Sequence, residues 1–380
     1  MRTIAEHAPQ EEGQRPLRML ALVAKGWGIS PAQRFRLEQW APYLAREHGI
    51  ILDFRPFESP QLTKILYGKG HVAEKVWWTS FDFLRRAKMV ALARRYDGVV
   101  ISREAALIGP AIYERLLALT GAPMVFDFDD TIWLSQPGAS ANGFFSRLRF
   151  PGKAAAACRL ATAVTPGNQY LATYASRFNN RVFVVPTSIE LNTYQVQPEL
   201  QFNDPFVVCW TGSTTTLAHF ECAREALEQL ARERRIIVKV ICNIPPSRPI
   251  AGAETQFVEW RQEREVAEIG AAHVGIMPLP DDDISRGKCG LKALQYMATG
   301  RPAIVAPVGM NRDLITHRVN GLFASSTEAL VSALRELADD PNRRREMGLR
   351  ARETVQQHFS ARSVASRFAA VIREACPTSP

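Results

Sequence analysis

Short apolar runs alternate with amphipathic stretches along most of the chain. Strands are predicted where apolar residues are consecutive, and helices where they recur every three or four positions. In the first half the expected strands are 18–25, 51–57, 97–102, 123–130, 161–166 and 181–188, and the expected helices are 31–49, 60–95, 105–121 and 167–178. Strands that alternate with helices predict a parallel sheet with right-handed crossovers.

The same alternation starts again after a polar segment that contains proline. Residues 192–205 lack periodicity, and we interpret them as a linker between two domains. In the second half the expected strands are 206–210, 236–242, 273–279 and 303–307, and the expected helices are 216–233, 257–269, 291–299, 327–338 and 341–357.

The last segment carries apolar residues at helical spacing, namely Val364, Phe368, Val371 and Ile372. It predicts a helix that docks back onto the first domain. The predicted fold class is therefore α/β, with two Rossmann-like domains in tandem. The expected bounds are 1–16 for an N-terminal tail, 17–191 for the first domain, 192–205 for the linker, 206–360 for the second domain and 361–380 for the C-terminal helix and tail.

Length and composition fit this organisation. A chain of 380 residues with 46% hydrophobic and 22% charged residues can form two globular domains. Residues 1–16 have charges of both signs and no apolar core, so they do not resemble a signal peptide. The six cysteines are scattered, without a C-x-x-C pair or a histidine at ligand spacing, which predicts free thiols in a reducing compartment and a cytoplasmic protein.

The net charge of +9 favours anionic partners such as nucleotide phosphates, nucleic acid or an anionic membrane. No nucleic-acid motif with interleaved aromatic residues is present, so we expect no nucleic-acid partner. Residues 69–95 mix basic residues with Trp77, Trp78, Phe81 and Phe83. This pattern fits a helix at the inner face of a membrane, or a core helix whose basic side chains extend to water.

The densest candidate for chemistry is the block 286–323. Gly287 and Gly290 flank a loop whose backbone can approach a ligand, and a helix is expected to begin near Leu291. The free N–H groups and dipole of that helix end favour an anion. Lys288 and Lys292 are four residues apart and can lean over the same end. A solvated loop with two surface lysines would show the same pattern.

A second block has similar properties. A strand leads into Gly212, Ser213 and Thr214, and a helix is expected to follow. This turn predicts a second backbone site for an anion, so that a diphosphate would be held between the two helix starts. The alternative is an ordinary helix with a serine or threonine cap.

These two blocks resemble the group 1 (family 4-like) glycosyltransferases, retaining enzymes of the two-domain GT-B architecture. The similarity covers nearly all of residues 206–360 and depends on the segments GIMPL, QYMATGRP, IVAP, VGMNRDLI and NGLF. In the first half, GWGISPAQRFR, ISREAALIGP and TPGNQYLATYAS resemble segments of one branch of these enzymes.

The resemblance implies transfer of a sugar, with retention, from a nucleotide diphosphate sugar to a glycan, a lipid-linked molecule or a small molecule, as in polysaccharide biosynthesis. The first domain would bind the acceptor and the second the donor, with the reaction in a central cleft between the sheets. Lys288 and Lys292 would neutralise the departing diphosphate, so no metal and no cofactor besides the donor is expected. A basic helix on an anionic membrane would suit a lipid-linked acceptor.

The chain departs from the family at two positions. The family usually has two glutamates eight positions apart, and Gly287 and Gln295 stand there instead. Gln295 can still bond ribose hydroxyls, and Asp281 or Asp282 can replace the missing carboxylate, unless they belong to a solvated acidic loop. Glu265, near Trp260, is expected at the base pocket. The departure also leaves open a catalytically impaired, nucleotide- or glycan-binding relative.

On the acceptor side, the candidates follow predicted strands of the first domain: Arg34, Arg103, Asp129, Asp130 and Asn168. A surface helix face for Arg34 and a helix cap for Asn168 are the alternatives. His219 is expected to be structural.

The stretch DFDDT also matches a phosphatase pattern, with Asp127 as the nucleophile. Its position at about the fourth strand of a domain argues against that chemistry. We expect its aspartates to orient acceptor hydroxyls or to hold arginines such as Arg103.

Overall fold

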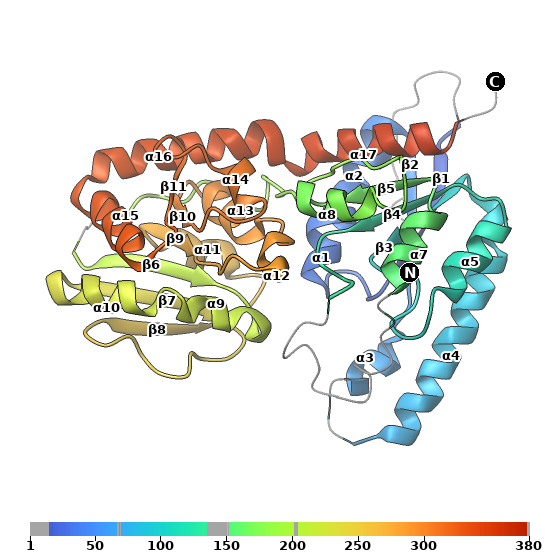
Figure 1. Cartoon of the computed structure of the whole chain (residues 1–380), viewed down its shortest axis with the longest axis horizontal. Coiled ribbons are helices and arrows are strands. Elements are labelled where there is room, and N and C mark those ends of the chain that lie inside the picture. The colour runs from blue at the N-terminus through green and yellow to red at the C-terminus, as the bar shows by residue number, and fades with distance from the viewer. Residues whose placement is uncertain are drawn as a thin grey trace. The chain divides into compact units, whose positions relative to one another are not determined.

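The computed structural model describes residues 15–66, 68, 70–134, 150, 152–200 and 204–377. They form two compact units (Figure 1). Unit 1 comprises Met1–Thr187 and Ala361–Pro380, and unit 2 comprises Ser188–Ser360. In both units helices pack on a sheet whose strands are all parallel, as the alternating pattern predicts.

Unit 1 has a five-stranded sheet in the order β2-β1-β3-β4-β5. Its strands are β1 (Leu17–Val23), β2 (Ile50–Pro56), β3 (Gly98–Ser102), β4 (Met124–Phe128) and β5 (Ala163–Pro166). Its helices are α1 (Pro31–Gln33), η1 (Arg34–Glu38), α2 (Gln39–His48), α3 (Pro60–Leu66), α4 (Val72–Ala91), η2 (Ala93–Arg95), α5 (Ile112–Leu119), α7 (Gly152–Leu160), α8 (Gln169–Ala175) and α17 (Ala361–Ala375).

The C-terminal helix α17 packs in the core of unit 1. Val364, Phe368 and Ile372 are fully buried, and the ring of Phe368 lies 5.0 Å from that of Trp40 in α2, measured between centroids. The apolar residues predicted from the sequence therefore form the buried face of this helix. Their burial keeps residues Ala361–Pro380 with the first unit although they are last in sequence.

A buried ion pair connects the segment after β1 to β4. Arg36 donates from Nε to Asp127 Oδ2 (2.8 Å) and from Nη2 to Oδ1 (2.6 Å), and both side chains are 1% exposed. The hydroxyl of Thr165 donates to the same carboxylate (2.8 Å). Asp127 therefore has no access to a phosphorylated substrate, and the phosphatase interpretation is wrong.

Unit 2 has a six-stranded sheet in the order β11-β10-β9-β6-β7-β8. Its strands are β6 (Phe206–Thr211), β7 (Ile236–Cys242), β8 (Glu254–Glu259), β9 (Val274–Met277), β10 (Ala303–Val305) and β11 (Gly321–Phe323). Its helices are η3 (Thr214–Thr216), α9 (Leu217–Glu221), α10 (Arg224–Glu233), α11 (Glu265–Gly270), α12 (Asp283–Arg286), α13 (Leu291–Ala298), α14 (Asn311–Leu314), α15 (Thr327–Asp339), α16 (Pro341–Thr354) and η4 (Val355–Phe359).

Several elements differ from the sequence-based expectations. Part of the helix expected at 257–269 is the edge strand β8, whose polar residues are tolerated because one side of it faces solvent. The three-residue β11 was not expected at all. The segment 181–188, expected to be a strand, pairs with the sheet only through a bridge between Val182 and Val164.

The segment expected to be a linker belongs to unit 2. The structure divides the chain between Thr187 and Ser188, before the predicted linker begins. Tyr194 is 3% exposed, and the backbone N–H of Gln197 donates to the carbonyl of Thr299 (3.1 Å). These contacts fix the described part of 192–205 on the second unit.

All six cysteines are free thiols, and five of them are buried. In the described part of the chain, no helix combines the length and apolar character needed to cross a membrane.

The buried pair gives a prediction for stability. Asp127→Ala leaves the Arg36 guanidinium buried without its counter-charge, and we expect it to destabilise the protein by about 3–5 kcal/mol. The measurement is urea denaturation of the whole chain. Asp129→Ala, which removes a partner of the partly exposed Arg103, is the control and should cost about 1 kcal/mol or less. Equal losses for the two variants would contradict the role assigned to the pair.

Candidate active site

The strand order of unit 2 creates a switch point between β6 and β9. These strands are neighbours in the sheet, and the chain leaves them toward opposite edges, β7 and β10. Open α/β sheets bind ligands beyond the carboxyl ends of strands at such a point. The segments that follow these two strands begin at Gly212 and Pro278 and contain most of the predicted donor residues.

The segment after β9 leads into α13 through a close-packed turn. Gly290 precedes the helix with φ of 71°, and a Cβ there would lie 2.2 Å from Leu314 Cδ1. Gly309, in the loop after β10, has φ of 54°, and its Cβ would lie 2.5 Å from the carbonyl oxygen of Arg286. The two loops therefore pack backbone to backbone beside the start of α13, as glycine alone permits.

Positive groups gather at this helix start. Lys292, in the first turn of α13, lies with Nζ 5.1 Å from the ring centroid of the buried Trp210. Burial, and then the charge of Lys288, lower the pKa of Lys292 to about 7. A half-neutralised lysine beside a second lysine, at the positive end of a helix, is a site that an anion would stabilise.

The neutral imidazole of His219 in α9 belongs to the same group, which consists of Lys288, Lys292 and His219 and which we call the cation cluster after its two lysines. Burial and the charges of Lys292 and Lys288 lower the pKa of His219 to about 4, whereas the charge of Asp282 opposes this shift. Its Nδ1 atom is buried without a hydrogen-bond partner among the described residues. The sequence analysis predicted a structural role for His219. The only feature of the sequence that indicated a role at the site is its position soon after the loop that follows β6.

In the turn after β6, which the sequence predicts as a second anion site, backbone N–H groups donate to side chains of unit 2. The N–H of Thr214 donates to Asn243 Oδ1 (2.8 Å), and Asn243 Nδ2 donates to Thr214 Oγ1 (2.7 Å). The N–H of Ser213 donates to the Thr216 hydroxyl (3.0 Å). The alternative of a capped turn therefore describes this segment, and a one-turn 3₁₀ helix and the short α9 replace the start of the expected long helix.

Gly212 is required for packing. Its N–H donates to the carbonyl of Ile241 (2.9 Å), and a Cβ there would lie 2.3 Å from Trp210 Cη2. The residue is thus a glycine because the ring beneath Lys292 needs the space.

The aspartates proposed to replace the missing carboxylate have local partners. Asp281 binds Arg286 (2.7 Å), and this bond lowers the pKa of its carboxyl group. Asp282 caps α12 by accepting from the N–H of Ser285 (2.7 Å), and Asp283 lies 3.4 Å from Arg286. These bonds support the alternative of an exposed acidic loop. Gly287 itself is buried at the end of α12, next to these residues.

Gln295 and Glu265 meet inside unit 2 instead of lining its surface. Gln295 Nε2 donates to the hydroxyl of Tyr194 (2.9 Å), this hydroxyl donates to Glu265, and Trp260 Nε1 donates to the other oxygen of Glu265 (2.7 Å). Gln295 is 3% exposed and Glu265 5%. The expected contacts with ribose and base are therefore not supported, because both side chains are engaged in this buried network.

In unit 1, three of the predicted acceptor residues come together. Arg103 follows β3 with φ of 64°, a left-handed conformation that is strained for an arginine. Its Nε donates to Asp129 (2.8 Å) and its Nη2 to Asp130 (3.4 Å), both of which follow β4. The prediction that these aspartates hold Arg103 is confirmed.

The other two acceptor candidates are buried. Asn168 caps α8 by accepting from the N–H of Leu171 (2.9 Å), and it is 1% exposed. Arg34 is 9% exposed and lies in the π-helical segment η1, with its guanidinium 4.6 Å from the ring centroid of Phe35. The cap predicted as the alternative for Asn168 is thus present, and Arg34 does not lie on an exposed helix face.

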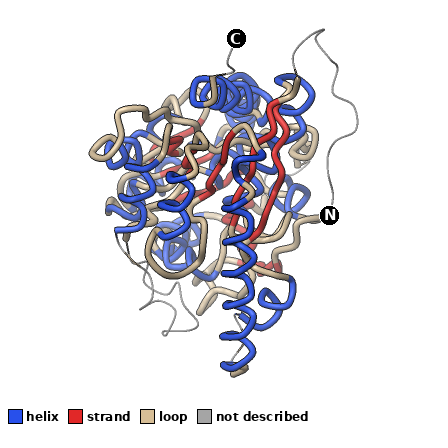
Figure 2. Tube along the Cα trace, turned by 90° about the vertical axis from the view of Figure 1, so that its right-hand side faces the viewer, coloured by secondary structure: helices blue, strands red, loops and turns tan. Residues whose placement is uncertain are grey.

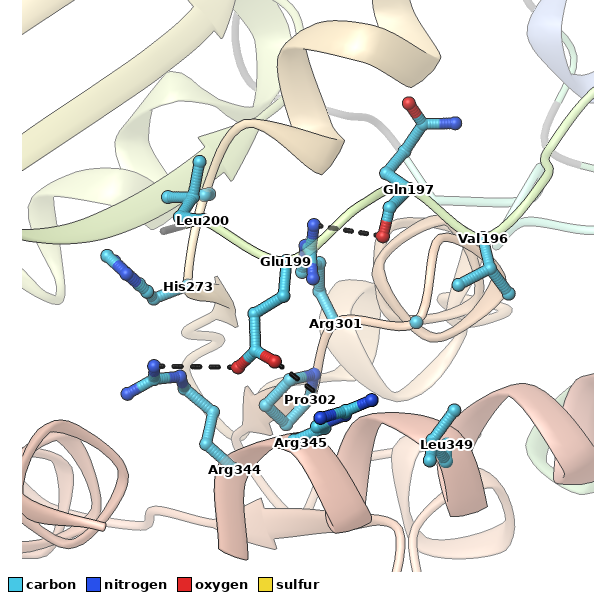
Figure 3. Close-up of a pocket in the computed structure, with 12 residues that line it drawn as sticks. Val196, Gln197, Glu199, Leu200, His273, Arg301, Pro302, Arg344, Arg345 and Leu349 are labelled. Atoms are coloured by element: carbon cyan, nitrogen blue, oxygen red, sulfur yellow. Dashed lines mark hydrogen bonds and ion pairs between the residues drawn. The ribbon is translucent and has the colours of Figure 1, made fainter. Parts of the chain in front are cut away.

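A cavity of about 330 Å³ lies at the amino ends of β9 and β10, opposite the carboxyl ends where the cation cluster lies (Figure 3). His273 and Pro302, which line it, directly precede β9 and β10. There the carboxylate of Glu199 lies 3.8 Å from Nη2 of Arg344 and 3.7 Å from Nε of Arg345, so these ion pairs join the segment 196–200 to α16. This cavity is therefore separate from the cation cluster, and its charges hold the chain segment onto the unit.

One family model matches the part of the chain that contains the predicted donor residues. Residues 205–340 match the family model described as glycosyl transferases group 1. This range contains the cation cluster, the turn after β6 and the loops around α13. A search of curated proteins gave no match.

The whole chain is similar in structure to several solved proteins. Alr3699/HepE from Anabaena, in complex with UDP and glucose, has 16% sequence identity and a TM-score of 0.64, with 94% of this chain and 99% of that chain covered. Sucrose-phosphate synthase from Thermosynechococcus elongatus has 16% identity and a TM-score of 0.66, with 95% and 99% covered. The lipopolysaccharide outer core galactosyltransferase WaaB has 13% identity and a TM-score of 0.62, with 94% and 99% covered.

At these identities the solved structures show the fold alone. The chain therefore has the two-domain GT-B fold, and its residues 205–340 match the group 1 glycosyl transferases.

Proposed function

We propose that this protein is a glycosyltransferase that moves a sugar from a nucleotide diphosphate sugar to an acceptor, with retention of configuration. The observation that carries the proposal is the cation cluster at the start of α13, within the family-matched residues and at the switch point of the sheet. Structures of Alr3699/HepE with UDP and with UDP-glucose give a precedent for a uridine diphosphate donor in this fold.

The cluster suits the chemistry of a departing diphosphate. When the bond between the sugar and the diphosphate breaks, negative charge develops on the leaving phosphate oxygen. Fixed positive groups and helix N–H groups stabilise that charge without rearranging at the moment of reaction. Lys292 and Lys288 would supply the charge, and the first N–H groups of α13, from Leu291 onward, would supply the donors.

The acceptor would meet unit 1 at the group formed by Arg103, Asp129 and Asp130. Both carboxylates are partly accessible, with 14% of each side chain exposed, and each can accept a hydrogen bond from a sugar hydroxyl. A glycan, a lipid-linked glycan and a small polyol all present such hydroxyls. The acceptor class is therefore a glycan or another polyhydroxylated molecule.

The direct test is an assay of the whole chain with a panel of nucleotide diphosphate sugars and mixed glycan acceptors. We expect transfer or slow donor hydrolysis with one donor class, and anomeric retention in the product by NMR. Activity should survive a chelator, because Lys288 and Lys292 supply the positive charge.

One observation favours a second candidate. Gly287 carries no carboxylate, and the aspartates nearby are held by Arg286 and Ser285. A catalytically impaired binding protein would bind a nucleotide sugar tightly but would neither hydrolyse it nor transfer its sugar to any acceptor of the panel.

Lys292→Ala is expected to abolish the rise in melting temperature that a bound nucleotide sugar produces, because the diphosphate loses the lysine in the first turn of α13. The control is Lys64→Ala, which removes an exposed lysine of α3 in unit 1 and should leave the rise intact. Thermal denaturation with and without donor measures both. An unchanged rise in Lys292→Ala would refute the diphosphate assignment.

Affinity for the donor should depend on pH through Lys292. Below its pKa of about 7 the free site is already charged, so affinity is at its maximum. A bound diphosphate raises this pKa, so at higher pH binding must take up a proton, and affinity falls by up to about tenfold per pH unit. Titration calorimetry in two buffers of different ionisation enthalpy measures the uptake. Lys292→Met should remove it; the same uptake in that variant would assign the proton elsewhere.

A further inference from the structure

Helix α4 is inverted compared with an ordinary surface helix of a globular protein. Charged residues point into unit 1: Lys75 is 5% exposed, Asp82 0% and Arg86 2%. Large apolar residues point outward, with exposed fractions between 47% and 72%: Val72, Val76, Trp77, Phe81 and Leu84. This helix is the long one on the right of Figure 1, and it runs down the side that faces the viewer in Figure 2.

The inward charges fix the orientation of the helix. Asp82 accepts from the N–H of Ser59 (2.8 Å), and Arg86 donates to the carbonyls of Arg55 and Val23 (2.9 Å each). Lys75 donates to the carbonyl of Gly68. Rotating the helix to bury its apolar face would break all of these bonds, so the apolar face stays outward.

Helix α5 extends the same surface. The hydroxyl of Tyr113 donates to the carbonyl of Phe83 (2.6 Å), which joins α5 to α4. The exposed apolar residues of α5 are Ile112 (52%), Leu116 (42%) and Leu119 (78%). We call the eight exposed apolar residues of the two helices the α4–α5 face. Apolar residues gathered in this number on two adjacent helices mark an interaction surface.

The charges that accompany this face are mostly positive. Within α4, η2 and α5, which the structure describes completely, the exposed basic residues are Lys88, Arg94, Arg95 and Arg115. The only exposed acid there is Glu74, which is paired with His71 (3.0 Å). A two-fold contact with a second copy would place these basic groups opposite one another. An anionic bilayer complements both the apolar and the basic groups.

We propose that the α4–α5 face docks unit 1 onto the surface of an anionic lipid bilayer. Helix α4 lies parallel to the membrane plane, with Trp77, Phe81 and Leu84 among the head groups and acyl chains. Lys88 and the arginines contact lipid phosphates. This docking uses no residue of the cation cluster, so it holds whether or not the proposed sugar transfer does.

Co-sedimentation of the whole chain with phosphatidylcholine vesicles, with and without phosphatidylglycerol, tests the docking without any sugar donor. We expect binding that requires phosphatidylglycerol and weakens with salt. The double variant Val76→Ser, Leu84→Ser should bind at least about tenfold more weakly. The matched control is Val319→Ser, Leu349→Ser, which removes apolar groups of similar exposure (51% and 50%) from unit 2 and should bind normally.

A second measurement separates insertion from simple adsorption. Brominated lipids should quench part of the tryptophan fluorescence of the wild-type chain, and less in Trp77→Phe, because Trp77 is 69% exposed on this face. Equal vesicle binding by both double variants would overturn the proposal. So would dimerisation in solution that only the α4 variant abolishes, since the occupant would then be a second copy.

Discussion

The electrostatic arrangement at the start of α13 is the feature on which the account of this protein depends. The charge of Lys288 disfavours the charged form of Lys292, and both lysines disfavour the charged form of His219. The helix dipole adds to the same positive potential. In the folded chain the pKa of Lys292 is about 7, below its ordinary 10.5. The lowered pKa of Lys292 reduces the stability of the folded chain. The full reduction is present below pH 7, and it declines as the pH rises from about 7 toward 10.5. A bound anion stabilises the charged lysine and removes this loss of stability, so a site of this kind favours anion binding.

The rest of unit 2 holds that arrangement in place. Gly290 and Gly309 let two loops pack against each other at the helix start, and Gly212 leaves room for the ring beneath Lys292. On another side of α13, the bonds among Gln295, Tyr194 and Glu265 fix the helix to the chain segment that enters the unit. The scaffold therefore holds these groups in position before a ligand binds, as preorganisation requires.

Much of this was predictable from sequence, and the limits have physical causes. The parallel sheets, the returning C-terminal helix and the pair Lys288 and Lys292 depend on spacings of a few residues, which a sequence displays directly. The roles of Gln295 and Glu265 depend on Tyr194, which lies 71 residues before Glu265 and was assigned to a linker. The turn at Thr214 depends on Asn243 at the end of the next strand. In each case the role of the residue depends on a partner that is distant in sequence and close in the fold, and a single sequence does not reveal such a partner.

The central claim is that the diphosphate of the donor binds at the start of α13. A crystal structure of the chain with a bound nucleoside diphosphate tests this most directly. The account predicts a phosphate within hydrogen-bonding distance of Lys292 Nζ and of the first backbone N–H groups of α13, near His219. A nucleotide bound instead in the cavity beside Glu199 and Arg344, with the cation cluster empty, would contradict it.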